Sequence, residues 1–234
     1  MNEKLSGIFS FLDITSKTGL ASDDNFNDLT AFQKLFYTQA KSKIGVDAVY
    51  FLRDKEGIAK IPLIYFSMLE DNDSARAAQL HNLSWNMGEA PLLFIVTPTE
   101  LKIYNNYQTP RKKDGSLDPE AGLIDIINLL SDLETQRQKL YPYNRILLES
   151  GDYWRRTKGR FNINSRIDIT LMNNLRVMRR RLISRIKARG ANSQISLENI
   201  VSVVHGLLSR SILIKYLEER KDSKGESCFS QRLL

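Results

Sequence analysis

The apolar residues of this 234-residue chain change their spacing near residue 140, and this change limits the folds open to it. Before that point, short apolar runs such as residues 91–96 are typical of buried strands. After it, apolar residues recur at spacings of three and four over about twenty positions, which predicts long helices. We therefore expect an α+β fold in two domains: residues 1–140 with a mixed sheet flanked by helices, and residues 141–234 with helices alone.

The two predicted domains also differ in charge. Residues 1–140 hold 15 Lys/Arg against 19 Asp/Glu, a net charge of −4. Residues 141–234 hold 19 against 8, a net charge of +11, so the whole chain carries +7. Positive charge gathered on predicted helices is typical of a surface that binds a polyanion, although a run of charge is often only a solvated face. We expect nucleic acid as the partner.

The elements expected along the chain follow from the same patterns. We expect helices at residues 26–43, 72–87, 122–140, 167–187 and 195–219, and strands at residues 46–52, 58–66, 91–96 and 101–104. Asp23 or Asp24 is the expected N-cap of the first helix. The first two strands form a hairpin, in which Pro62 indicates an edge or a bulge. The first 25 residues are weakly patterned.

Composition narrows the class of protein. A hydrophobic content of 42% is enough for a packed core. The single cysteine, Cys228, excludes an internal disulfide and a cysteine-based zinc site, and it suits a reducing cytoplasm. We see no signal-peptide pattern, and no apolar run that approaches the roughly 18–20 residues of a membrane span. We therefore expect a cytoplasmic protein with no membrane partner.

Basic residues follow one side of the helix expected at residues 167–187. At 3.6 residues per turn, Arg176, Arg180 and Lys187 fall near one face, with Arg179 beside them. The apolar stripe of the same helix lies on a different face. The pattern predicts an exposed row of cations.

A second basic cluster lies between residues 153 and 161, where cationic and aromatic side chains alternate. Its members are Tyr153, Trp154, Arg155, Arg156, Lys158, Arg160 and Phe161. Guanidinium groups suit phosphate oxygens, and aromatic rings can stack on bases or sugars. We predict DNA contacts from the cations of both clusters, namely Arg155, Arg156, Lys158, Arg160, Arg176, Arg179, Arg180 and Lys187.

A structural interpretation competes with this one. Trp154 then belongs to the core, which we favour for that residue, and the arginines pair with carboxylates, namely Asp152, Asp168, Glu218 and Glu219. Nineteen cations against eight acids leave too many for such pairing to absorb them all.

Residues able to carry catalysis or bind a cofactor are few. The chain has no Gly-x-x-x-x-Gly-Lys-Ser/Thr loop and no Gly-x-Gly-x-x-Gly loop. His81 and His205 lie on different predicted helices, so we expect structural or surface roles for them. Nothing near Cys228 could serve as a base for a nucleophile. We predict no metal site and no cofactor site formed by these residues.

The α-β-β-α-β order, with Asp47 opening the hairpin, resembles the restriction-endonuclease-like core. That resemblance implies an acid on one strand and a Glu-x-Lys triplet on the next, where carboxylates hold magnesium and the lysine helps to activate water. Asp47 matches the first acid, but Tyr65 and Ser67 occupy the Glu and Lys positions. Glu70 and Asp71 offer carboxylates only from a shifted register, without a lysine. We therefore expect a degenerate core with no catalytic residues; magnesium is expected only if the core is active.

The basic half carries a second and more specific resemblance. SGDYWRRTKGRFNINSRIDITLMNNLRVMRRRL and HGLLSRSILIKYLEER look like the segment preceding the catalytic domain in N-6 adenine DNA methyltransferases of restriction-modification systems, which act in phage defence. LIKYLEER, at residues 213–220, is similar to a helix of methylase amino-terminal helical domains. Neither the glycine-rich S-adenosylmethionine loop nor an Asn-Pro-Pro-Tyr tetrapeptide occurs. Methylation and S-adenosylmethionine are therefore expected only with a downstream methylase domain.

Together these observations predict a DNA-binding, non-catalytic N-terminal part of an adenine methyltransferase or restriction-modification protein. Its partners would be duplex DNA and a methylase catalytic domain or subunit. One alternative is a helical protein-interaction module that docks onto a methylase or nuclease subunit. A live magnesium-dependent DNA endonuclease is the third possibility.

Overall fold

The computed structural model describes residues 3–54, 56–112, 114–130, 136–161, 166–189 and 196–219. The chain divides into two compact units, Met1–Ile169 and Thr170–Leu234. The boundary expected near residue 140 therefore falls inside the first unit. The physical reason is packing, because Leu140, Tyr143 and Tyr153 are buried in the same core as the strands. Cys228 lies outside the described residues.

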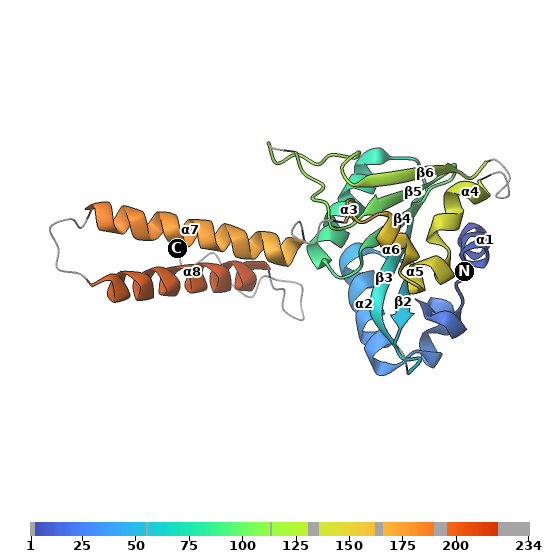
Figure 1. Cartoon of the computed structure of the whole chain (residues 1–234), viewed down its shortest axis with the longest axis horizontal. Helices are drawn as coiled ribbons and strands as arrows, with labels where there is room; N and C mark the ends of the chain where they lie inside the picture. The colour runs from blue at the N-terminus through green and yellow to red at the C-terminus, as the bar shows by residue number, and fades with distance from the viewer. Residues whose placement is uncertain are drawn as a thin grey trace. The chain divides into compact units, whose positions relative to one another are not determined.

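The first unit is built on a six-stranded mixed sheet in which the strands follow one another in chain order (Figure 1). The strands are β1 Leu20–Ser22, β2 Ala48–Arg53, β3 Ala59–Met68, β4 Leu92–Val96, β5 Glu100–Asn105 and β6 Leu123–Asn128. β3 and β4 are parallel, joined by a helical crossover, and every other neighbouring pair is antiparallel. The unit therefore has the predicted α+β class with a mixed sheet.

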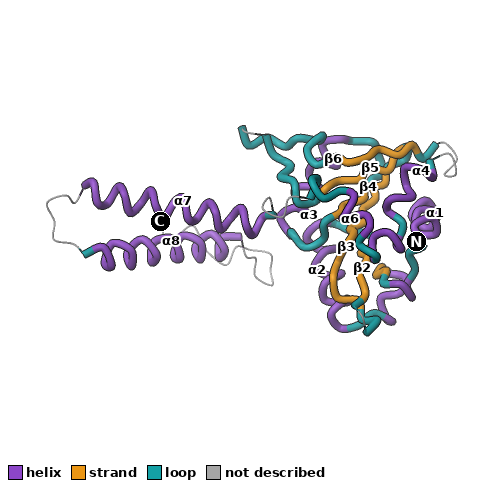
Figure 2. Tube along the Cα trace, in the orientation of Figure 1, coloured by secondary structure: helices purple, strands orange, loops and turns teal. Residues whose placement is uncertain are grey.

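Helices cover both faces of this sheet (Figures 1 and 2). Over one face lie α1 Glu3–Leu12, α4 Arg137–Leu140, α5 Arg145–Glu149 and α6 Asp152–Arg156; over the other lie α2 Ala31–Ile44 and α3 Ser74–Met87. Short 3-10 turns complete the unit at η1 Ser16–Thr18, η2 Asp23–Asp28 and η3 Tyr141–Tyr143. Because strand side chains alternate, neighbouring residues such as Ile64 and Tyr65 enter different cores.

The predicted hairpin, the helix at residues 72–87 and the buried strand at residues 91–96 are confirmed. β3 is a central strand rather than an edge. Its Pro62 is opposite Phe51, beside a break in the β2–β3 register between Tyr50 and Phe51. A bulge there accommodates a residue that cannot donate to the ladder, so the bulge alternative for Pro62 holds.

Two predictions for the first unit were wrong, and one helix was not predicted. Residues 122–140 do not form one helix, because their first part pairs with β5 as strand β6 and only Arg137–Leu140 is helical. α2 begins at Ala31, because the Thr30 hydroxyl accepts a hydrogen bond from the Gln33 amide and makes Thr30 the N-cap. The weakly patterned start contains α1, which buries Leu5, Ile8, Phe9 and Leu12.

The second unit holds most of α7 Ile167–Arg189 and all of α8 Leu197–Glu219, as predicted. The Ser196 hydroxyl accepts a hydrogen bond from the Asn199 backbone amide at 3.2 Å and caps the start of α8. Among the described residues of this unit, Ile200 and Val204 are the buried hydrophobic side chains. By length and composition alone, the stretch Leu197–Lys215 could cross a membrane, contrary to the expectation from sequence. This is weak evidence, since helices of soluble proteins pass the same test.

Candidate nucleic-acid interface

Asp47 is fixed at the start of β2 by the backbone of β3. Its amide donates to the Phe66 carbonyl at 2.8 Å, and its carboxylate accepts from the Met68 amide at 2.7 Å. Burial raises the pKa of Asp47, and the Met68 hydrogen bond opposes that rise. The carboxylate is therefore engaged in holding the end of the hairpin.

The two positions that would complete a nuclease site carry buried hydroxyls. The register places Ser67 opposite Asp47, and Tyr65 lies two residues before it on the same face. Both residues are fully buried, and neither hydroxyl has a hydrogen-bond partner among the described residues. The Tyr65 ring stacks on Phe36 of α2, with centroids 6.3 Å apart. These side chains contribute to packing and offer no second carboxylate and no lysine.

The acids that could replace them are not gathered into a site. Asp71 pairs with Arg76 at 3.2 Å, and Glu70 is exposed. Near Asp47, Asp23 pairs with Lys41, which lowers the pKa of Asp23. In the described part of the chain, no three His, Cys, Asp or Glu side chains gather in a way that could hold a metal ion.

The two histidines have different environments. His81 is fully buried, and its Nε2 lies 3.2 Å from the Asn105 carbonyl oxygen. Burial lowers the pKa of His81 to about 4, so the ring is neutral at pH 7 and Nε2 donates to that carbonyl. His205 is exposed on α8. The predicted structural or surface roles of the two residues are consistent with these positions.

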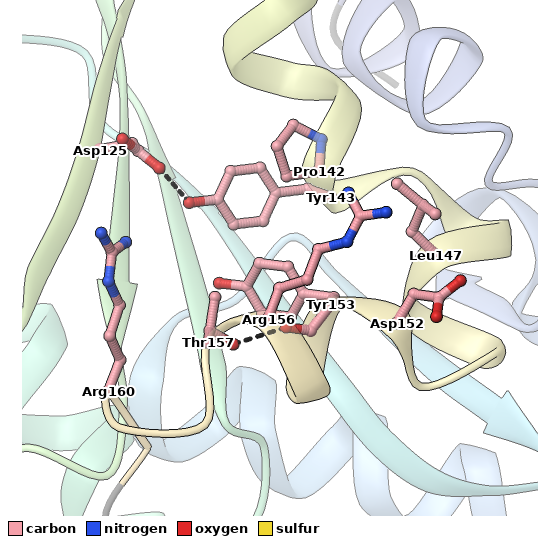
Figure 3. A pocket seen from close by; sticks show the side chains of 9 residues that line it. All are labelled: Asp125, Pro142, Tyr143, Leu147, Asp152, Tyr153, Arg156, Thr157 and Arg160. Atoms are coloured by element: carbon pink, nitrogen blue, oxygen red, sulfur yellow. Dashed lines mark hydrogen bonds between the residues drawn. The ribbon is translucent and has the colours of Figure 1, made fainter.

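The first basic cluster lies on α6 and the turn that follows it. Arg155, Arg156, Lys158 and Arg160 are all exposed. Arg155 pairs with Asp152 at 2.6 Å, as the structural interpretation expected. The other two arginines, Arg156 and Arg160, line a pocket of about 260 Å³ (Figure 3).

The aromatic residues of this cluster anchor it to the core. Trp154 is partly buried against the core, and its indole Nε1 donates to the Leu148 carbonyl at 3.1 Å. The rings of Tyr153, Trp154 and Phe161 contact one another edge to face, with centroids 5.0–5.9 Å apart. The preference for Trp154 as a core residue is confirmed, and these rings fix the position of the arginines.

The second basic cluster extends along α7. Arg176, Arg179, Arg180 and Lys187 are exposed, as are three cations outside the predicted set: Arg181, Arg185 and Arg189. None of the seven forms an ion pair with a carboxylate of the described residues. Arg176 donates to the Asn173 amide oxygen at 3.4 Å. The structural interpretation also named Asp168, Glu218 and Glu219, whose side chains are not described.

The additional cations widen the basic surface of α7. At 100° per residue, Arg181 lies just outside the apolar stripe, and Arg185 and Arg189 lie at the angles of its early members, Ile167 and Leu171, rather than on the face of Arg176 and Arg180. A search for one helical face passed over them. A count of charge along the whole helix would have found them, because Asp168 is the one acidic residue in its sequence.

Comparisons with protein-family models, with curated proteins and with solved structures gave no match for this chain.

Proposed function

We propose that this chain is a DNA-binding, non-catalytic N-terminal part of an adenine-specific DNA methyltransferase or restriction-modification protein. The observation that carries the DNA-binding part is the surface of α7. Seven cations are exposed on one helix of 23 residues, and no described carboxylate neutralises them. Unpaired guanidinium groups held on a rigid helix are suited to the phosphates of a duplex.

For the first unit we propose a degenerate restriction-endonuclease-like core. The support is topological: the β2–β3 hairpin is followed by α3 and by β4, which is parallel to β3. Asp47 keeps its place at the strand end, while Tyr65 and Ser67 fill the positions of the missing acid and lysine. We therefore assign no magnesium to this unit.

The link to adenine methylation rests on the sequence resemblance of the basic half. The two segments that carry this resemblance fall largely on α6, α7 and α8. In this proposal S-adenosylmethionine belongs to a downstream catalytic domain, which also is the protein partner of this chain. The chain itself acts by holding DNA for that domain.

The phosphate contacts give the proposal a quantitative test. If about six cations contact phosphates, the logarithm of the affinity for duplex DNA falls with the logarithm of salt at a slope of about −5. Reversing the charge of Arg179, Arg180 and Arg181 to Glu should weaken binding at least 100-fold at low salt. Gel shifts with one duplex at several salt concentrations measure both quantities.

A matched control separates a local effect from the change in net charge. Lys17, Lys112 and Lys139 are exposed on the first unit, and reversing them to Glu changes the net charge by the same amount. This control should bind DNA within a few-fold of the unmodified chain. Equal binding by the α7 variant and the unmodified chain would contradict the proposal.

The non-catalytic part of the proposal has its own assay. The purified chain, incubated with plasmid and Mg²⁺ or Mn²⁺, should leave the plasmid supercoiled, because the nearby Asp23 is paired with Lys41 and the Tyr65 and Ser67 positions supply neither a carboxylate nor a lysine. Cleavage that disappears in Asp47→Ala would instead establish a live endonuclease.

A second function, docking onto a catalytic subunit, is favoured by one observation on α8. Val203, Leu207 and Ile214 are 64%, 52% and 43% exposed, at spacings of four and seven that place them on one face. An apolar row open to solvent is typical of a protein contact. For this function, Val203→Ser with Leu207→Ser would abolish binding to the catalytic subunit, while the α7 charge reversal would leave DNA binding unaltered.

The proposal places the chain in the cytoplasm, away from membranes. Leu197–Lys215 contains Arg210, and it lies in the same unit as the arginine-rich α7. We expect the purified chain to remain in the supernatant when neutral phosphatidylcholine vesicles are sedimented. Sedimentation with those vesicles would place α8 at a membrane.

A further inference from the structure

The pocket in Figure 3 lies within the first unit, and none of its lining residues belongs to α7, whose cations carry the proposed duplex contact. Its walls come from β6, from the turn at residues 141–143 and from the α5–α6 region. Pro142 and Leu147 supply apolar surface, and Tyr143 and Tyr153 supply two phenol rings. The volume of about 260 Å³ limits the ligand to a small molecule, at most about the size of one nucleotide.

The pocket is lined by four charged side chains whose formal charges cancel, but its two cations form no ion pair with the described carboxylates. Two of the four side chains are carboxylates that already have partners: Asp125 accepts a hydrogen bond from the Tyr143 hydroxyl, and Asp152 pairs with Arg155 at 2.6 Å. The other two are the guanidinium groups of Arg156 and Arg160, and neither pairs with a carboxylate of the described residues. An anionic ligand could therefore contact both guanidinium groups without breaking an existing ion pair.

Tyr153 adds a buried donor to the same pocket. The residue is 3% exposed, and its hydroxyl has no hydrogen-bond partner among the described residues. Burial raises the pKa of Tyr153 to about 12, against the opposing influence of the nearby Tyr143 hydroxyl and, to a smaller extent, of Arg160, so the hydroxyl keeps its proton at neutral pH. A buried hydroxyl without an acceptor is destabilising, and a ligand oxygen would supply the missing acceptor.

The surrounding contacts hold these groups in place. The Asn105 side-chain amide donates to the Arg160 carbonyl at 2.6 Å, which ties the turn to β5. The Thr157 hydroxyl donates to the Tyr153 carbonyl at 2.7 Å (Figure 3). These hydrogen bonds hold the backbone around the pocket in place before a ligand arrives.

We infer that this pocket binds one nucleotide, with its phosphate on Arg160 and the Tyr153 hydroxyl and its base beside Arg156. Guanidinium forks match phosphate oxygens, and a planar guanidinium can also stack on a base. Pro142 and Leu147 give the sugar and base an apolar wall. The nucleotide is either free in solution or at the end of a DNA strand, since both present the same chemistry.

Calorimetric titration of the full chain tests this assignment. The probes are the four deoxynucleoside 5′-monophosphates, the four matching nucleosides and inorganic phosphate. We expect at least one monophosphate to bind at least tenfold more tightly than its nucleoside and than phosphate alone. A single-stranded oligonucleotide with a 5′-phosphate, compared with its 5′-hydroxyl form, shows whether a strand end also enters.

Substitutions assign the two ends of the ligand. Arg160→Ala should remove the preference for the monophosphate over the nucleoside, whereas Arg156→Ala should weaken both about tenfold. Tyr153→Phe should weaken the monophosphate about threefold to tenfold while leaving the chain as stable or more stable, because the unpaired hydroxyl is gone. Lys158→Ala is the matched control, and it should stay within twofold because Lys158 is exposed in the same turn and does not line the pocket.

Three results would overturn the inference: no binding of any monophosphate at millimolar concentration, equal affinities for monophosphate and nucleoside, or equal losses in Lys158→Ala and Arg160→Ala. The site does not depend on the proposed function of α7. The α7 charge reversal should leave nucleotide affinity unchanged, so failure of one assignment is distinguishable from failure of the other.

Discussion

The two units of this chain differ in what their residues do. The first, Met1–Ile169, holds 21 Lys/Arg against 22 Asp/Glu, a net charge of −1, and it contains almost all of the buried hydrophobic side chains. The second, Thr170–Leu234, holds 13 against 5, a net charge of +8, and buries Ile200 and Val204 among its described residues. The first unit packs its hydrophobic side chains into buried cores, whereas most of the described side chains of the second unit are exposed to solvent.

This difference predicts whether a substitution should change the stability of the chain or its binding. Changes inside the first unit should alter its free energy of unfolding, because its two cores lie on either side of one sheet. Changes on α7 and α8 should alter binding far more than stability, because most of their side chains are in solvent. Both tryptophans, Trp85 and Trp154, lie in the first unit, so their fluorescence reports on its unfolding alone.

The largest expected effect is on stability, and it compares one buried residue of the first unit with one of the second. Phe94 is fully buried and contacts Phe66 and Tyr143 edge to face, with centroids 5.2 and 5.5 Å away. Phe94→Ala should lower the free energy of unfolding of the first unit by about 3–5 kcal/mol. Val204→Ala should lower that of the second by about 1–2 kcal/mol, since it removes little more than two methyl groups.

Denaturant titrations check the pair, with tryptophan fluorescence for the first unit and helical circular dichroism for the whole chain. The expected pattern is a large shift of the fluorescence transition in Phe94→Ala and none in Val204→Ala. If Val204→Ala moves the fluorescence transition as far, the two units unfold together and the comparison between them fails.

The next largest expected effect is the pH dependence of the free energy of unfolding of the first unit. The pKa of His81 is lowered to about 4 by burial, so as the pH falls the unfolded chain takes up this proton first, near its ordinary value of 6.5. The contribution of neutral, buried His81 to the free energy of unfolding is therefore intact above about pH 6.5 and is lost as the pH falls toward 4. The loss over this interval is about 3 kcal/mol.

The non-titrating variant His81→Gln should lack this part of the pH dependence of the fluorescence transition. His205→Gln, at an exposed position of α8, serves as the control and should keep it. Identical slopes in the His81 variant and the unmodified chain between pH 6.5 and 4.5 would show that His81 is not the group responsible.

Most elements of the first unit could be predicted from local signals. The buried strand β4 and helix α3, with Gly88 at its end, follow from an apolar run and from helical spacing. The α7 and α8 helices of the second unit follow from long periodic stripes. These signals lie within one element, so no tertiary information is needed to read them.

The errors share a physical cause, which is that pairing partners lie far along the chain. LIDIIN of β6 is compatible with a helical face, and only the ladder to β5 makes it a strand. The pocket was missed for the same reason, because it joins Asp125 of β6 to Arg156 and Arg160. The basic clusters could be predicted because net charge needs no partner to be recognised.

Two glycines of the first unit allow a smaller test of its packing. Gly122 has φ +73°, and a Cβ there would lie 2.8 Å from His81 Cε1 and 2.9 Å from the Asn105 carbonyl oxygen. Gly57 has φ +78° with nothing within 4 Å. Both alanine variants carry the left-handed strain of about 1 kcal/mol, and Gly122→Ala adds overpacking for a total of about 2–3 kcal/mol. Equal shifts of the fluorescence transition in the two variants would contradict the tight packing around His81.

The smallest effect has the opposite sign and belongs to the second unit. Gly206 lies inside α8, and a Cβ built on it meets nothing within 4 Å. Gly206→Ala should therefore stabilise α8 by about 0.5–1 kcal/mol, because alanine loses less backbone entropy on entering a helix. The gain should appear in the circular dichroism transition and not in tryptophan fluorescence. Destabilisation would mean that another surface approaches α8 closely at this glycine, and the second unit would then be a packed element like the first.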